Sequence, residues 1–474
     1  MSDLPKAMGY RMPAEWEPHE GTWLSWPHNP RTWVGNFGPI PSVFVKIVGA
    51  LCPSENVHIC VRDTMSESSV RKLLKDAGLD SNSIHFYHIP TNDAWARDHG
   101  PVFITRNRHI RSGAQDMRGD SALLFGLESV ELSALEIPQA VLNLVPATLC
   151  RKYGVMPFDF FDSVLMLATS EGEAPPVLDE IRALLKYQIE PVLAKKEEIS
   201  AAIEKYHGST ALEKDGQEMA VLDREHDVPK SKVAVVDWKF NSWGGKYPPW
   251  EDDDAVPERV AETLRLTCFH PRMVLEGGSI DVNGKGTLLT TESVMLNPNR
   301  NPLLSKKQIE SRLDEYLAAK NVIWLGDGIL GDDTDGHVDD LTRFVNASTL
   351  VTVFEDDATD ENFRALNENH ERLQTAKDQD GHTFEIIKLP TPGKVFRGAR
   401  HGERQPEERL PASYANFYIG NGCLLAPVFG HKNDAKVLGL FGDLFPGRVI
   451  IGINCKDLVG GYGAIHCVTQ QQPA

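Results

Sequence analysis

Short apolar runs, separated by polar and glycine-containing breaks, form the pattern of the first hundred residues. Strands of about five to eight residues alternate there with longer segments of helical periodicity. The expected elements are a helix over 41–52, a strand over 56–63, a helix over 66–77, a strand over 83–89 and a strand over 101–105. This alternation predicts the α/β class, interrupted by a polar loop at 92–101.

The middle of the chain has a different pattern. Polar stretches at 107–121 and 208–230 read as linkers. Between them, apolar residues at 141, 142, 144, 145 and 149 predict a helix, SVLMLATS a strand, and LDEIRALL and EEISAAIEKY two further helices. We interpret 122–209 as a small α/β domain inserted between two parts of a larger domain, 1–110 and 231–474.

After residue 231 the first pattern returns. KVAVVDWKF (232–240) predicts a strand, and the loop from WGGKYPP runs into a helix. Three stretches combine a turn with a β-branched or leucine-rich run, as hairpins do: 282–296, 343–356 and 418–431. A repeated ββαβ unit arranged around an axis fits them, and so does an ordinary mixed α/β sheet.

Composition narrows the class of protein. The 474 residues are 41% hydrophobic and carry a net charge of −18, which excludes a disordered chain and argues against nucleic acid as the main partner. An acidic surface attracts cationic substrates. No apolar run approaches the ~18 residues of a membrane span, and the first residues show no apolar signal segment. The seven scattered cysteines read as reduced thiols, so we expect a cytoplasmic protein.

Cys467 differs from the other cysteines in its surroundings. It follows a glycine-rich turn, GGYG, that includes Gly460 and Gly461. Glycines let a backbone approach a ligand closely. A thiol on such a turn suits nucleophilic attack, whereas a buried structural thiol remains the alternative.

A second candidate is the segment GDDTDGHVDDLTRFV. If a strand begins at its histidine, His337 and Asp339 point to one face and suit acid–base chemistry. A solvated acidic turn is the alternative. A calcium loop fits poorly, because Gly331 and Thr342 occupy the positions of its two end ligands. A zinc site is equally weak, because no second ligand has a usual spacing from His337.

Two further segments carry polar residues beside glycine or aromatic residues. In NDAWARDHGP, Trp95 and the carboxylates of Asp93 and Asp98 suit a cation, although a structural Arg–Asp turn fits equally well. In LEGGSIDVNG, Glu276 precedes two glycines at a predicted strand end. No phosphate-binding loop, dinucleotide fingerprint or GxSxG elbow is present.

Together these segments resemble the agmatine deiminase and bacterial-type peptidylarginine deiminase family. The matching stretches occur in the family's order over 12–106 and 231–473. They are MPAEWEPHEGTWLSWP, NDAWARDHGP, VDWKFNSWGGKYPP, LEGGSIDVNGKGTLLTT, LNPNRNP, DTDGHVDDLTRF and GGYGAIHCVTQQQP. The resemblance implies a five-bladed pseudo-symmetric α/β propeller of the pentein type. It also implies hydrolysis of a guanidinium to a ureido group and ammonia, without metal or organic cofactor.

The resemblance also implies roles for individual residues. Cys467 is the nucleophile, and His337 gives a proton to ammonia and then activates water. Asp98 and Asp339 hold the guanidinium, Glu276 contacts the substrate and supports the histidine, and Trp95 walls the substrate. The glycines at 460 and 461 let the backbone approach it. His99 and His466 are left out, because neighbouring side chains on a strand face opposite ways.

Agmatine, hydrolysed to N-carbamoylputrescine in polyamine biosynthesis, is the substrate that the resemblance favours, because WGGKYPP is more similar to agmatine deiminases. Arginine in peptides is the alternative. Tyr462 departs from the GGGG or GGGN pattern that is commoner in the family, and we expect its bulk to narrow the mouth of the site or to alter specificity.

The inserted residues resemble the N-terminal domain of GspE-like type II secretion ATPases. Some of those domains bind cyclic di-GMP through an upstream RxGxxL-type segment, which this sequence lacks. We therefore expect a protein-docking role, with an insertion of no function, or an adaptor on an inactive enzyme, as alternatives. Deletion of 112–228 should leave an active deiminase if PVFIT and KVAVVDWKF are neighbouring strands. The oligomeric state stays open, a homo-oligomer being one candidate.

Overall fold

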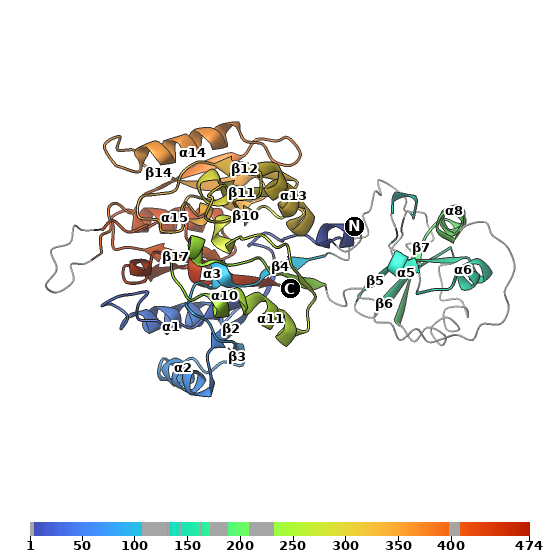
Figure 1. Cartoon of the computed structure of the whole chain (residues 1–474), viewed down its shortest axis with the longest axis horizontal. Coiled ribbons are helices and arrows are strands. Elements are labelled where there is room, and N and C mark those ends of the chain that lie inside the picture. Colours follow the sequence, from blue (N-terminus) through green and yellow to red (C-terminus); the bar gives the residue numbers. More distant parts are fainter. Residues whose placement is uncertain are drawn as a thin grey trace. The chain divides into compact units, whose positions relative to one another are not determined.

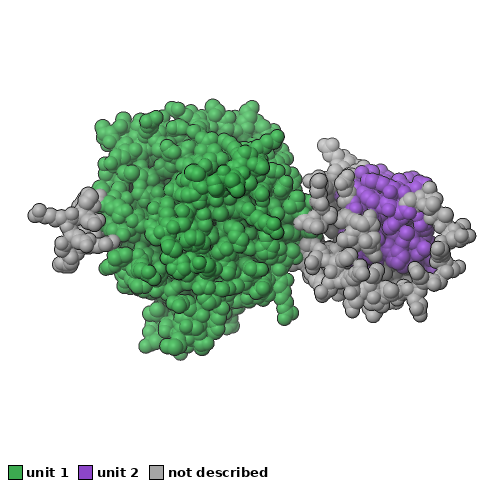
Figure 2. Space-filling model, in the orientation of Figure 1, with its two compact units in different colours: residues 1, 3–106, 233–474 green, residues 2, 107–232 purple. Residues whose placement is uncertain are grey.

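The computed structural model describes residues 4–106, 232–397 and 408–474, and, between them, 130–207 apart from 131, 136, 138, 143, 162–163 and 171–187. The chain forms two compact units (Figure 2), one from 3–106 and 233–474 and the other from 107–232. Both predicted linkers and the helix expected for LDEIRALL lie outside the described residues.

Five sheets make up the described part of the larger unit. Each contains an antiparallel pair of strands whose second member is parallel to the next strand. The sheets are β19–β1–β2–β3 (Gln470–Pro473, His19–Ser25, Asn56–Val61, Ile84–His88), β4–β8–β9 (Val102–Thr105, Val233–Val236, Cys268–Phe269), β10–β11–β12 (Asp281–Val282, Thr287–Thr291, Asn321–Leu325), β13–β14–β15 (Thr342–Asn346, Thr349–Phe354, Glu385–Pro390) and β16–β17–β18 (Tyr418–Ile419, Cys423–Val428, Val449–Asn454).

A helix connects the two parallel strands of every such sheet, which gives the ββαβ unit that the three repeated stretches indicated. These helices are α1 (Ile40–Leu51), α11 (Val256–Leu264), α13 (Lys306–Leu317), α14 (Phe363–Thr375) and α15 (Asp434–Leu444). They lie outside the strands (Figure 1). The larger unit is thus a mixed α/β fold.

One further long helix, α2, and several short ones complete the described part of the larger unit. They are η1 (Pro5–Met8), α2 (Thr64–Asp76), α3 (Ala96–His99), α9 (Ser242–Gly245), α10 (Glu251–Asp254), η3 (Gly277–Ser279), α12 (Glu292–Met295), η4 (Val338–Asp340), η5 (Leu458–Gly461) and η6 (His466–Val468). Several of these end in the loops that carry the predicted site residues.

Apolar spacing explains the best-predicted elements. α1 buries Ile40, Val43, Phe44, Ile47, Val48 and Leu51, a single stripe at intervals of three and four residues. α2 starts with a capping box in which Asp63 and Ser66 satisfy each other's backbone N–H groups. The middle strands β8 and β11 are buried along their whole length, as strands covered on both faces are.

The first sheet joins the two ends of the chain. β19 runs antiparallel to β1, with Trp23 opposite Gln470 and Thr22 opposite Gln471. Cys467 lies three residues before β19. This pairing therefore anchors the C-terminal turn beside strands formed by the first residues of the chain.

Three predicted elements differ from the observed ones. The strand expected from His337 begins at Thr342, because the His337 N–H donates to the side chains of Asp332 and Thr334 and residues 338–340 form η4. The strand expected over 232–240 ends at Val236. The helix expected around 141–149 is two helices, α5 (Gln139–Leu142) and α6 (Ala147–Tyr153), with Pro146 at the start of the second.

The smaller unit has a core and a sheet of its own. Its sheet has the order β5–β6–β7 (Val155–Phe161, Val164–Thr169, Gln188–Leu193), and its other described elements are η2 (Leu132–Ala134) and α8 (Lys196–His207). β6 and α8 confirm the strand and the helix predicted there. A cluster of buried apolar residues from α5, α6, β5, β6, β7 and α8 forms its core.

Nowhere in the described part of the chain does a helix combine the length and the apolar character that crossing a bilayer requires.

Candidate active site

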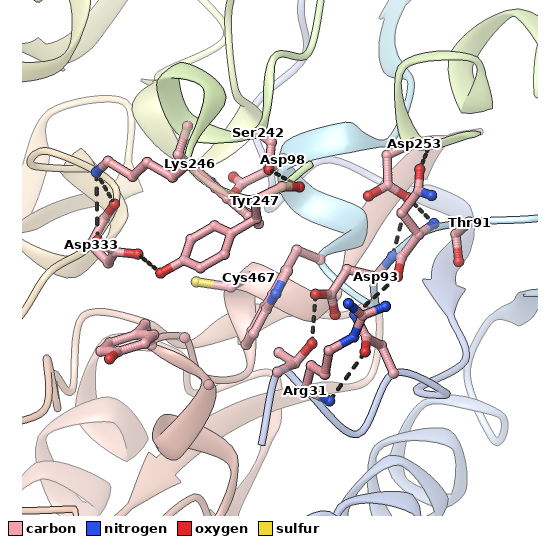
Figure 3. A pocket seen from close by; sticks show the side chains of 18 of the residues that line it. Arg31, Thr91, Asp93, Asp98, Ser242, Lys246, Tyr247, Asp253, Asp333 and Cys467 are labelled. Carbon is pink, nitrogen blue, oxygen red and sulfur yellow. Dashed lines mark hydrogen bonds and ion pairs between the residues drawn. The ribbon is translucent and has the colours of Figure 1, made fainter. Parts of the chain in front are cut away.

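The larger unit encloses a cavity of about 810 Å³. Cys467, Asp98, Trp95 and Gly461 line it, together with residues of the loops around 28–34, 91–93, 242–253 and 333–334. In Figure 3, Cys467 lies between Tyr247 and Asp333 on one side and Asp93 and Asp253 on the other. Segments from both parts of the larger domain thus meet around one sulfur atom.

Asn416 fixes the position of Cys467. Its Nδ2 donates to Sγ at 3.1 Å, and its Oδ1 accepts from the backbone N–H groups of His466 and Cys467. Burial, followed by the negative charges of Asp339 and Asp340, raises the pKa of the Cys467 thiol well above its ordinary value. A cation bound beside the sulfur would offset those charges and favour the thiolate.

His337 lies among carboxylates and is fully buried. Its Nδ1 is 3.6 Å from Oδ1 of Asp98, and its Nε2 is 3.9 Å from Oε2 of Glu276. Burial alone would lower its pKa, but Asp98, Glu276 and Asp339 raise it to about 9. Neither ring nitrogen has a hydrogen-bond partner among the described residues. The imidazole is therefore protonated at neutral pH and free to give a proton to a ligand.

Asp98 projects from α3, a single turn. Its Oδ2 accepts from Nε1 of Trp243 at 2.9 Å, and its Oδ1 accepts from the Gly278 N–H at 3.1 Å. Burial raises the pKa of Asp98 to about 6, against the opposing charge of His337. The carboxylate is thus held in one orientation at the wall of the cavity.

The two carboxylate oxygens of Asp339 differ, because only one of them accepts a hydrogen bond from a described residue. Its Oδ2 accepts from Nδ1 of His466 at 2.7 Å and lies 3.7 Å from Sγ of Cys467. Its Oδ1 is buried without a partner among the described residues. Burial opposes ionisation, but the hydrogen bond and charge of His466 lower the pKa of Asp339. A carboxylate with one free oxygen beside the nucleophile can accept from a guanidinium N–H.

Glu276 approaches Nε2 of His337, the ring nitrogen opposite the one that faces Asp98. Nε of Arg300 donates to its Oε1 at 2.6 Å. Burial would raise the pKa of Glu276, yet His337 and Arg300 lower it. Glu276, like His337 and Asp339, is not among the residues that line the cavity, and its own contacts are with His337 and Arg300.

Gly278 explains how three charged groups come so close together. A Cβ atom at this position would lie 2.6 Å from Nδ1 of His337, 2.8 Å from Oδ1 of Asp98 and 3.0 Å from Oδ2 of Asp339. Only a residue without a side chain fits there. The second glycine of LEGG was the available signal, and sequence reasoning did not use it.

Trp95 and the glycine turn form one wall. The indole of Trp95 packs 5.4 Å from that of Trp33. Cβ atoms at Gly461 and Gly463 would come within 2.9 and 2.5 Å of Trp95, so these glycines lie against its ring. Gly460 is not among the residues that line the cavity, and its carbonyl accepts from the lining residue Arg397 at 2.7 Å. Its expected contact with substrate therefore has no counterpart in the structure.

The reason for leaving out His466 was wrong. Residues 466–468 form a 3₁₀ turn and not a strand, so His466 and Cys467 reach the same region. Nε2 of His466 contacts Oε2 of Glu15 at 2.8 Å, while Nδ1 holds Asp339. His99, in contrast, lies away from the cavity and bonds to Ser25. Glu15 is a long-range partner that no local motif could reveal.

The mouth of the cavity is built from aromatic and charged side chains. Tyr462 adopts a φ of 73°, donates to Glu408 at 2.7 Å and lies 4.7 Å beneath the guanidinium of Arg397. Opposite it, the Tyr247 hydroxyl donates to Asp333. Tyr462 is half-buried and lines the cavity.

Two further carboxylates, the half-buried Asp93 and the buried Asp253, also line the cavity. Burial raises the pKa of Asp93 to about 6, and burial and the charge of Asp93 raise that of Asp253 well above its ordinary value. Two groups with metal-ligand spacing occur among the described residues, Asp237–Cys268–His270 and Asp378–Asp380–His382, and neither lines the cavity.

The chain belongs to the Porphyromonas-type peptidyl-arginine deiminase family, whose model matches residues 11–120 and 193–473. Residues 125–212 match the MshEN domain, the GspE-like N-terminal domain. Both resemblances stated from sequence are therefore confirmed.

Named relatives point to one branch of this family. An agmatine deiminase of Medicago truncatula is 30% identical over 491 aligned positions, covering 100% of this chain and 99% of that protein. One from Pseudomonas aeruginosa (strain LESB58) is 29% identical, covering 100% and 98%. The solved agmatine deiminase of Enterococcus faecalis has a TM-score of 0.68 at 26% identity, covering 99% of this chain and 97% of that one. That of C. jejuni with substrate bound, at 22% identity and a TM-score of 0.64, supports the fold.

Proposed function

We propose that this protein hydrolyses agmatine to N-carbamoylputrescine and ammonia. The observation that carries the proposal is the convergence of a buried thiol, a protonated imidazole and carboxylates, with acceptor atoms left free. Oδ1 of Asp339 and both ring nitrogens of His337 are buried without a hydrogen-bond partner among the described residues. Oδ2 of Asp339 lies 3.7 Å from Sγ of Cys467, and Nδ1 of His337 lies 3.6 Å from Oδ1 of Asp98. The named relatives support agmatine as the substrate.

Binding comes first in the proposed mechanism. The guanidinium enters beside Trp95, and Asp98 and Asp339 accept its N–H groups, which fixes its plane. Its positive charge favours loss of the Cys467 proton to solvent. Glu276 keeps His337 protonated through this step.

Two covalent steps follow. The Cys467 thiolate adds to the guanidinium carbon, His337 donates its proton to the departing nitrogen, and the C–N bond breaks to release ammonia. An S-alkylthiouronium remains on the sulfur. Water then adds to its carbon while neutral His337 takes a proton. The C–S bond breaks as the ureido carbonyl forms, and the remaining hydroxyl proton returns to the sulfur.

We further propose an architecture for the larger unit, a cellular location and a role for the inserted unit. We take the five sheets as five blades of a pseudo-symmetric pentein propeller, with Cys467 near its axis. A cytoplasmic location is supported by the seven cysteines, all of which are unpaired. For the inserted unit we propose that it docks onto another protein. Separately, we propose that the chain forms a homo-oligomer.

The test is a ureido-group assay with agmatine, free arginine and an arginine-containing peptide side by side. Turnover of agmatine above the others, abolished in Cys467→Ala, is the expected result. Preferred turnover of the peptide would replace agmatine by peptidyl-arginine, for which the family is named. Absence of turnover by folded protein would contradict the proposal.

A further inference from the structure

Three metal-ligand side chains share one face of the sheet that the insertion interrupts. β8 and β9 are parallel, with Val235 opposite Cys268 and Val236 opposite Phe269. Asp237 and His270 directly follow the two strands, and the Asp237 N–H continues the ladder by donating to the Phe269 carbonyl at 2.8 Å. Residues two apart on a strand share a face, so His270 lies on the side of Cys268.

The three donor atoms are already close together. One nitrogen, one sulfur and one oxygen of His270, Cys268 and Asp237 lie within 4.8 Å of one another, with His270 Nδ1 2.8 Å from Asp237 Oδ2. Tetrahedral zinc, with bonds of about 2.0–2.3 Å, holds its donors about 3.3–3.8 Å apart, so small side-chain adjustments of these three residues would complete the geometry. Thiolate, imidazole and carboxylate are the donors that zinc prefers.

Asp237 supplies a second, independent observation. Its side chain is 4% exposed, yet its Oδ1 has no hydrogen-bond partner among the described residues. A buried carboxylate oxygen without a partner is costly unless a cation or a donor reaches it. The His270 side chain is 47% exposed, which leaves an entry path from solvent.

The surrounding charges are mixed. Asp254 and Glu258 add negative charge, and both act on Lys239. Lys239 Nζ lies 4.0 Å from Oδ2 of Asp237 but is closer, at 3.1 Å, to Asp254. A cation at Asp237 therefore competes only with the Lys239 ammonium, which already pairs with Asp254.

We propose that Asp237, Cys268 and His270 bind one zinc ion, with water as the fourth ligand. On binding, the Cys268 S–H proton leaves to solvent and a Zn–S bond forms. β9 is a two-residue strand, so few hydrogen bonds hold it to β8. The ion would clip this short strand to β8, which begins where the insertion ends. None of the three residues lines the catalytic cavity.

Cobalt titration of the full chain tests the site. A Cys467→Ala background removes the catalytic thiol, so a thiolate-to-Co²⁺ charge-transfer band would report another cysteine. We expect one Co²⁺ per chain, displaced by Zn²⁺. Cys268→Ser and His270→Ala should each weaken binding on the order of 100-fold or remove the band. Lys239→Met should tighten it, because a competing positive charge is gone.

Matched variants separate this site from others. Cys52→Ser changes another partly exposed cysteine and should leave the band intact. His382→Ala removes the second metal-spaced group and should also change nothing. Circular dichroism would confirm that each variant is folded. An absent band, or a band unaffected by Cys268→Ser, would overturn the proposal, as would loss of binding in His382→Ala alone.

Discussion

At the scale of single residues, burial and charge oppose each other in the site. Burial disfavours ionisation of Asp98 and raises its pKa to about 6, whereas carboxylates overcome the burial of His337 and raise its pKa to about 9. Both groups therefore carry their useful charge over one window of pH. The proposed chemistry needs Asp98 ionised to accept from the guanidinium and His337 protonated to release ammonia.

The pH dependence of kcat, measured at saturating agmatine so that the bound guanidinium already favours the Cys467 thiolate, follows from these two values. Activity should rise with pH as Asp98 loses its proton near 6, because the ionised form lies above its pKa. It should fall near 9 as His337 loses its own, because the protonated form lies below its pKa. Steady-state rates from pH 5 to about 10 measure both limbs. A profile with no alkaline limb would contradict the assigned role of His337.

Glu276→Gln sharpens that measurement. Removing its charge should lower the pKa of His337, so the alkaline limb should move to lower pH. The matched control is Glu292→Gln, whose carboxylate pairs with Lys306 and Arg372 away from the cavity. The control should leave both limbs in place.

At the scale of elements, short turns and not strands carry the chemistry. Asp98 lies in α3, Gly278 in η3, Asp339 in η4 and Cys467 in η6. η3 contacts both α3 and η4. These turns pack closely around Gly278. Its backbone N–H donates to Asp98, and the absence of a side chain there lets Asp98, His337 and Asp339 approach one another.

Gly278→Ala tests this packing. Its Cβ would displace His337 or Asp98, so kcat/KM should fall on the order of 100-fold or more. Gly439→Ala is the matched control, because Gly439 is exposed in α15 with no atom within 4 Å of the added Cβ. There alanine should raise the free energy of unfolding by about 0.5–1 kcal/mol and leave the rate unchanged. Wild-type rates in Gly278→Ala would refute the close-packing account.

At the scale of the whole molecule, the insertion joins one hairpin. β4 and β8 are antiparallel, and their last pair before the insertion is Thr105 opposite Val233. Asp98 lies beyond the other end of β4. The neighbouring-strand condition set from sequence is met, and the larger unit retains its sheets and core on its own residues.

Replacing 112–228 by a short Gly/Ser linker should therefore leave a folded enzyme. Loop length adds little to the closing entropy of a hairpin. We expect kcat/KM within a factor of about three of the full chain, less than about 1 kcal/mol in the activation barrier. Activity, melting temperature and far-UV circular dichroism of the two forms check this. An insoluble or inactive deletion protein would show that the insertion is required for folding or catalysis.

The sequence by itself determined many of the local elements and pointed to the candidate reacting groups. Apolar spacing defined α1, β2 and α2, because burying one stripe or one strand is a local demand. The family motifs picked out Cys467, His337, Asp98, Asp339 and Glu276, and the composition change separated the insertion. Each of these depends on residues that are neighbours in the chain.

Only the tertiary structure decided how those groups meet. Glu15 reaches His466 across 451 positions, and Asn416 reaches Cys467 across 51, contacts that no local pattern encodes. The irregular turns at His337 and His466 depend on side-chain bonds to the backbone, not on strand periodicity, so a period-of-two argument misplaced both. The pKa values of the site groups also depend on tertiary structure, because burial and neighbouring charge exist only once the five sheets have packed together.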